Sequence, residues 1–112
     1  MTISGSPPPP YYAVIFTSRQ KQEVQGYAEM AERMDALAKT MPGYLGIESA
    51  RDAKGFGITV SYWESEAAIV NWKKNAEHLQ AQAKGRAEWY EDYTVRVAKV
   101  ERAYAMKKQG RP

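Results

Sequence analysis

The first third of the chain switches from a short hydrophobic period to a longer one. Residues 11–17 are apolar and β-branched, with Tyr12, Val14 and Phe16 on one face, and this pattern predicts a strand. Apolar residues then recur every three or four positions, which predicts an amphipathic helix over about 23–40. The apolar stripe of this helix consists of Tyr27, Met30, Met34, Leu37 and Met41.

A proline–glycine pair separates this helix from a predicted β-hairpin. Pro42 lacks the backbone donor that a helix needs, and Gly43 tolerates the left-handed backbone that commonly follows a helix, so the helix ends here. Residues 44–51 and 56–63 then predict two strands. Residues 52–55 connect them as a hairpin turn that ends in glycine.

The second half of the chain repeats the change of period. Ser65 caps a predicted helix whose first turn carries the favourable acidic residue Glu66. The apolar stripe of this helix consists of Ile69, Trp72, Ala76, Leu79 and Ala83. Gly85 ends the helix, and residues 88–106 predict a long last strand. The apolar positions of that strand change parity at Val97-Ala98, which predicts a β-bulge there.

The order β-α-β-β-α-β predicts an α+β fold of the ferredoxin-like type with an antiparallel sheet. Two helices cover one face of such a sheet. We expect Tyr11, Ala13, Ile15 and Trp63 on the other face, where they would meet water. Exposed apolar area of this kind favours sheet-on-sheet packing in a homodimer, with the long last strand pairing with the partner subunit.

The composition is that of one globular domain: 112 residues, of which 44% are hydrophobic and 26% charged. We assign the domain to residues 11–106. A proline-rich arm precedes it at residues 1–10, and a basic tail follows at residues 107–112. The net charge of +3 is mild, and much of the excess lies in the tail, which is typical of a solvated terminus.

Several classes of site are excluded by residue usage. The chain has no cysteine and one histidine, which excludes disulfides and thiolate sites and argues against a zinc site. It also lacks a phosphate loop, a dinucleotide-binding glycine pattern and a Ser-His-Asp order. We therefore expect neither a metal nor a bound cofactor. No apolar run approaches the ~18 residues of a membrane span, so we expect no membrane partner and a cytoplasmic location.

Candidate catalytic residues gather between positions 62 and 93. Trp72 lies on the apolar helix stripe, so it is a packing residue or the aromatic wall of a pocket. His78 has the side chain best suited to proton transfer near neutral pH, although a surface role is an equal alternative. A break at Asn75-Ala76 would allow both side chains to face one cavity. Arg86 could hold an oxyanion or pair with acidic neighbours.

Further aromatic residues are candidates for binding a substrate. We assign this role to Tyr62, Trp63, Tyr27 and Tyr93, and we expect Tyr62 and Trp72 to wall one dry pocket. Residues 54–57 read Lys-Gly-Phe-Gly, which matches the first half of an RNA-binding RNP1 motif. The second half lacks the aromatic residues needed to stack bases, so we expect no nucleic-acid partner.

The chain is similar to the antibiotic biosynthesis monooxygenase (ABM) domain family of the dimeric α+β barrel superfamily. The resemblance extends over residues 11–104. It is carried by Pro42-Gly43-Tyr44, by SYWESEAAIVNW at residues 61–72, by EHLQAQAKGR at residues 77–86, and by the strand from Asp92 to Tyr104. The resemblance implies a homodimer whose two sheets form a barrel, with a pocket between helices and sheet in each subunit.

The resemblance also implies an activity. Some members of the family oxygenate aromatic polyketides or quinols with O2 and without metal or flavin, and others degrade heme. Heme-degrading members carry a histidine ten residues after the helical tryptophan and an asparagine on the first strand. Trp72 matches the tryptophan, but Gln82 replaces the histidine and residues 16–19 contain no asparagine. Ala68 offers no polar group one turn before Trp72, where polyketide-oxidising members have polar neighbours.

We therefore expect a small cofactor-independent monooxygenase that oxidises an electron-rich phenol, quinol or anthrone with O2. In this hypothesis His78 takes a proton from the substrate, Arg86 or a tyrosine holds the resulting anion, and Trp72 lines the pocket. The alternative is a non-catalytic dimer that binds a small molecule in the same pocket. An RNA-binding module is the weaker alternative.

Overall fold

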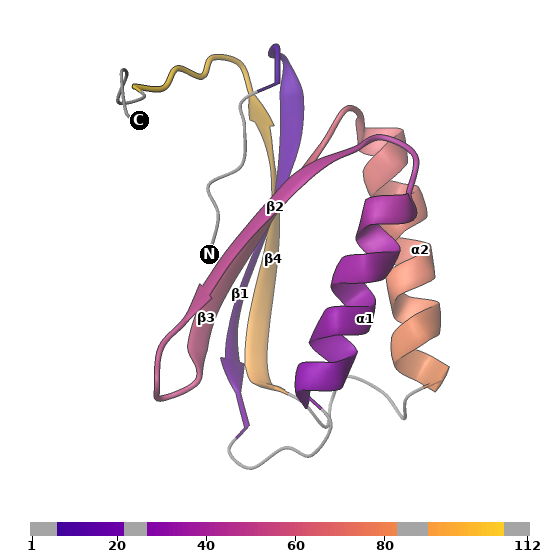
Figure 1. The fold of residues 1–112 in the computed structure, drawn as a ribbon, viewed down its shortest axis with the longest axis vertical. Helices are drawn as coiled ribbons and strands as arrows, with labels where there is room; N and C mark the ends of the chain where they lie inside the picture. Colours follow the sequence, from indigo (N-terminus) through magenta and orange to yellow (C-terminus); the bar gives the residue numbers. More distant parts are fainter. Residues whose placement is uncertain (1–6, 22–26, 83–89, 107–112) are drawn as a thin grey trace, which may run out of the picture.

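A computed structural model describes residues 7–21, 27–82 and 90–106 of the chain. Four strands form one antiparallel sheet in the order β2-β3-β1-β4, and the helices follow β1 and β3 in the sequence. The elements are β1 (Tyr11–Gln20), α1 (Tyr27–Thr40), β2 (Tyr44–Arg51), β3 (Phe56–Trp63), α2 (Glu66–Gln82) and β4 (Tyr90–Val100). Both helices lie on the same side of the sheet (Figure 1). The predicted ferredoxin-like α+β fold is therefore confirmed.

Strand register decides which side chains face the helices. Trp63 pairs with both Tyr12 and Tyr44, so these three side chains lie on the same face, beneath α2. Trp63 is 0% exposed. The prediction that Trp63 shares the other face with Tyr11 and Ala13 is wrong, because a shift of one position along a strand reverses the face.

The face away from the helices is less exposed than we predicted. Tyr11 and Ala13 are buried, and Ile15 is half-buried. The ring of Tyr11 packs edge-on against Tyr62 with 5.8 Å between the ring centroids, which covers part of this face. The large apolar side chains exposed on this face within the sheet, Phe56 and Ile58, belong to the other end of β3.

β4 is an edge strand, and this position explains its irregular sequence. Its residues 91–99 are exposed, including the apolar residues Val95 and Val97 on the helix side. The predicted bulge at Val97-Ala98 is absent: both residues keep their pairing with β1, and the register of that pair shifts instead between Arg19 and Gln20. Because neither face of β4 is buried in the protomer, the order of its apolar and polar residues does not indicate how it pairs with β1.

The end of the last strand differs from the prediction. The last strand ends at Val100, and residues 101–106 continue without regular structure, leaving the sheet at the end where β1 begins (Figure 1). α1 begins at Tyr27, and the predicted start near Glu23 lies outside the described residues. The capping of α2 agrees with the sequence, since Ser65 Oγ accepts a hydrogen bond from the Ala68 amide at 3.1 Å.

The turn between α1 and β2 positions the start of α2. Gly43 has a φ of +84°, and a Cβ at this position would lie 2.6 Å from the Ala68 Cβ on α2. The Gly43 carbonyl also accepts a hydrogen bond from the Glu64 amide at 2.9 Å. Glycine is therefore needed here both for its backbone conformation and for the close approach of α2.

We predict that Gly43→Ala lowers the free energy of unfolding by more than the roughly 1–2 kcal/mol of a left-handed alanine, because the Ala68 clash adds to that strain. Urea denaturation of Gly43→Ala, Ala68→Gly and the double variant measures both parts. In the double variant the clash is removed, because residue 68 has no Cβ, and the backbone strain of alanine at position 43 remains. Equal unfolding midpoints for Gly43→Ala and the wild type would contradict this account.

Candidate functional site

An aromatic cluster joins the sheet to α2. The rings of Trp63 and Trp72 stack with 5.6 Å between their centroids and 23° between their planes. Tyr44 packs edge-on against Trp63 at 5.7 Å. Trp63 Nε1 donates a hydrogen bond to Ser61 Oγ at 2.9 Å, which satisfies its polar atom in the core. Trp72 remains half-buried, so it can both pack on Trp63 and contact a ligand.

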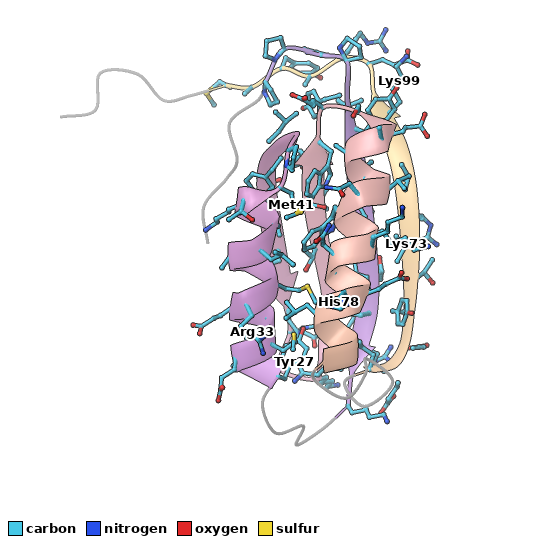
Figure 2. The ribbon with its side chains drawn as sticks, turned by 90° about the vertical axis from the view of Figure 1, so that its right-hand side faces the viewer. Tyr27, Arg33, Met41, Lys73, His78 and Lys99 are labelled. Carbon is cyan, nitrogen blue, oxygen red and sulfur yellow. The ribbon has the colours of Figure 1, made fainter. Side chains whose placement is uncertain are left out.

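His78 does not share the face of Trp72. α2 is continuous from Glu66 to Gln82, and the Asn75 side chain donates to the Asn71 carbonyl at 2.9 Å within the helix. The predicted break at Asn75-Ala76 is therefore wrong. The six residue steps from Trp72 to His78 turn the helix by about 120° net. His78 is exposed (Figure 2), and its catalytic role stays a prediction.

Tyr62 lies on the opposite face of the sheet from Trp72, because it alternates with Trp63 along β3. Its hydroxyl donates to Glu48 Oε1 at 2.8 Å. Burial, followed by this hydrogen bond and the Glu48 charge, raises the pKa of Tyr62 to about 12. Tyr62 and Trp72 therefore do not wall one pocket within a protomer, and Trp63 is the aromatic neighbour of Trp72. Arg86, the predicted anion-holding residue, lies outside the described residues.

A second aromatic cluster occupies the other end of the helix-covered face. Phe16 contacts Tyr90 and Tyr93, each with 5.3 Å between ring centroids. Tyr90 also packs edge-on against Tyr27 at 5.8 Å, and its hydroxyl donates to the Tyr27 hydroxyl at 3.3 Å. The structure thus brings the predicted residues Tyr27 and Tyr93 to one end of the sheet, far from Trp63.

The charge at this second cluster comes from Arg51, a residue that the sequence reasoning missed. Its guanidinium lies 5.6 Å from the centroid of the Tyr27 ring. Burial and the hydrogen bond to Tyr27 raise the pKa of Tyr90, against a smaller lowering by the Arg51 charge. Tyr90 therefore stays neutral and can donate hydrogen bonds at neutral pH. The sequence feature that could have indicated Arg51 is Gly57, which pairs with it across the hairpin and leaves space for its side chain.

The described residues form neither a metal-binding group nor a membrane-spanning helix. Within residues 7–21, 27–82 and 90–106, no three acidic or histidine side chains are grouped closely enough to hold a metal ion. In the same part of the chain, no helix has the length and apolar character needed to cross a membrane.

We predict that Ser61→Ala destabilises the fold by about 1–3 kcal/mol, because the buried Trp63 Nε1 loses its acceptor. Chemical denaturation followed by tryptophan fluorescence measures the effect. Ser49→Ala, an exposed serine on the adjacent strand β2, is the matched control and should change stability by less than about 0.5 kcal/mol. Equal effects of the two substitutions would exclude the hydrogen bond as the cause.

Comparison with known proteins places the chain in a family. The sequence model described as antibiotic biosynthesis monooxygenase matches residues 10–84. The uncharacterized protein YqjZ of Bacillus subtilis is 57% identical over 100 residues, which cover 89% of this chain and 88% of that protein. A jasmonate monooxygenase ABM of Pyricularia oryzae is 33% identical over 94 residues, covering 80% of this chain and 43% of that protein.

A solved structure agrees with these sequence matches. SnoaB, a cofactor-independent oxygenase from Streptomyces nogalater, superposes with a TM-score of 0.63 and 10% sequence identity, over 92% of this chain and 100% of SnoaB. At this identity the likeness concerns the fold. The sequence match over residues 10–84, which is more than half of the chain, leads to one conclusion: the chain belongs to the antibiotic biosynthesis monooxygenase family.

Proposed function

We propose that this protein is a monooxygenase that oxidises an electron-rich phenol, quinol or anthrone with O2 and without a bound cofactor. The observation that carries the proposal is the stack of Trp72 on the buried Trp63, which holds an aromatic surface rigidly at the helix–sheet boundary. Such a surface suits a flat aromatic substrate. The 33% identical jasmonate monooxygenase and the cofactor-independent oxygenase of the same fold support the reaction type.

The chemistry requires an ionised substrate. A base removes a proton from the phenol or anthrone, and the resulting anion passes one electron to O2. The two radicals then combine at a ring carbon, and loss of water leaves a new carbonyl. The methylene group of an anthrone and O2 thus become a carbonyl group and water, and a phenol and O2 become a quinone and water. Both oxygen atoms and all four electrons are accounted for by substrate and O2. The protein contributes by positioning the anion and stabilising its charge.

Trp72 positions the substrate in this proposal, and His78 is the predicted base. His78 would require a substrate that extends across the surface of α2, or a contribution from the partner subunit, because its side chain is exposed and lies about 120° from Trp72. The two residues therefore make separable contributions, which kinetics can distinguish.

We expect purified, metal-free protein to consume O2 in the presence of a panel of quinols and anthrones. Trp72→Phe should lower kcat/KM by about 10²-fold, because a shift of about 1 Å in the bound ring is sufficient for such a loss. His78→Ala should lower kcat by about 10²-fold if His78 is the base. Lys73→Ala, an exposed neighbour on α2, is the control and should leave the rate unchanged.

An oxygen electrode with product identification by mass spectrometry makes the measurement. O2 uptake equal to that of a protein-free control across the whole panel would overturn the monooxygenase proposal. Ligand-dependent thermal stabilisation in the same panel would then identify a binding protein.

We also propose that the active form is a homodimer built through the free face of the sheet. Phe56 and Ile58 of β3 are 40% and 42% exposed on this face. Together with Ala50 they border a shallow hollow of about 340 Å³ at the β2–β3 hairpin. The segment after β4 adds Tyr104, which is 98% exposed. A second copy would remove these apolar surfaces from water.

Sedimentation velocity at micromolar concentration should give a particle of about twice the 12.7 kDa mass of the chain. The Phe56→Asp/Ile58→Asp variant should sediment as a monomer, because two buried charges would oppose the contact. Val70→Asp, which changes an exposed apolar residue of α2, is the matched control and should remain dimeric. A stable wild-type monomer would contradict the proposal.

A further inference from the structure

Arg51 is a half-buried cation held by neutral groups. Its Nη2 donates to Ser18 Oγ at 2.8 Å, and its Nη1 donates to the Gly55 carbonyl and, at 3.5 Å, to the Ser18 carbonyl. Ser18 itself is buried. These contacts tie the end of β2 to β1 and to the hairpin turn, so the guanidinium has a defined position before any ligand arrives.

The sequence leaves space for the guanidinium in the sheet. Gly57 pairs with both Arg51 and Ser18. A Cβ at Gly57 would lie 2.6 Å from Arg51 Cζ and 2.9 Å from Arg51 Nε, so any larger residue would displace the charged group. The arginine lies across β3 over Gly57, and its guanidinium keeps this position because residue 57 has no side chain.

The charge of Arg51 has no anionic partner in the described part of the chain. Its acceptors there are two carbonyls and one hydroxyl, and no acceptor there engages its Nε–H. The adjacent Asp52 is committed to the turn, where its Oδ1 accepts from the amides of Lys54 at 2.9 Å and Phe56 at 3.0 Å. Removing a cation from water is unfavourable without a counter-charge, so this position favours an anion.

Aromatic rings surround this charge. The ring of Tyr27 lies against the guanidinium, and Tyr90 packs edge-on against Tyr27. Phe16 and Tyr93 continue the cluster toward the exposed edge strand β4, where Tyr93 is itself exposed. The cluster therefore has a charged end at Arg51 and an apolar, partly exposed end at Phe16 and Tyr93. Figure 2 places Tyr27 and Met41 toward opposite ends of α1. Asn71, which precedes Trp72 on α2, donates a hydrogen bond to Met41 Sδ at 3.8 Å, so this group lies away from Trp72.

We propose that Arg51 and the Tyr27–Tyr90 pair form a binding site for the carboxylate of an aromatic acid, with the ring of the ligand against Phe16 and Tyr93. The fork of a guanidinium matches the geometry of a carboxylate, and the tyrosine rings supply the apolar wall. Because this site lies about 20 Å from Trp63 along β1 at the usual strand rise, it is a ligand site separate from the substrate surface at Trp72, and it does not rest on the proposed function. Binding itself does not require turnover.

The test uses 2-naphthoate and its neutral analogue 2-naphthamide with the full-length protein, measured by isothermal titration calorimetry. The wild type should bind the acid at least ~10-fold more tightly than the amide, as expected for a charge-assisted pair. Arg51→Gln should abolish this preference and change amide binding by less than ~3-fold. Arg51→Lys should retain part of the preference, because it keeps the charge and loses the fork.

A second measurement needs no variant. In protein labelled with ¹⁵N, the Arg51 Nε–Hε resonance should shift on titration with 2-naphthoate and remain in place with 2-naphthamide. This result stands even if Arg51→Gln fails to fold. Equal affinities of the wild type for acid and amide, or an unmoved Arg51 resonance at saturation with the acid, would overturn the site and leave Arg51 as a hairpin anchor.

The outcome is independent of the oxidation test. Binding of naphthoate that depends on Arg51, together with no O2 uptake across the panel of quinols and anthrones, would support this site and count against the monooxygenase proposal. O2 uptake with neutral quinols, together with equal binding of acid and amide, would overturn this site alone.

Discussion

The packing of Trp63 is the interaction on which the other features depend. Its side chain is fully buried, stacks on Trp72 of α2, and receives Tyr44 edge-on. Loss of a buried aromatic of this size typically costs about 3–5 kcal/mol, which is a large part of the stability of a small domain. The same contact determines how α2 lies on the sheet, and so it places Trp72.

The helix-covered face consequently has two ends of different character. The Trp63 end is apolar and closed on the sheet side, with one indole hydrogen-bonded to Ser61. The other end, about 20 Å away along β1 at the usual strand rise, holds the Arg51 charge among tyrosine rings. Under the two proposals, an aromatic substrate at Trp72 and an aromatic acid at Arg51 would contact opposite ends of this face. The fold achieves this because β1, at the centre of the sheet, carries residues of both ends.

The element order and most element boundaries could be predicted from hydrophobic periods, because each period reflects a local geometry. The predictions failed where the local hydrophobic pattern does not determine the position of a residue in the tertiary structure. The change of apolar parity in β4 predicted a bulge. An edge strand that is exposed on both faces needs no regular alternation of apolar and polar residues, so the change does not reflect its pairing. Trp63 was placed on the wrong face because no local signal states how β3 aligns with β1. Arg51 was missed because its importance depends on Gly57 and Ser18, which lie on two other strands.

The sequence alone was sufficient for the family, the ferredoxin-like order and the likeness of the 61–72 segment to monooxygenases of this family, since these are properties of consecutive residues. The tertiary structure decided which candidate residues are neighbours. It set Tyr62 and Trp72 on opposite faces of the sheet, kept His78 on a continuous helix away from Trp72, and brought Arg51 to Tyr27. Those relations depend on strand register and helix rotation, which arise from contacts between residues far apart in the chain.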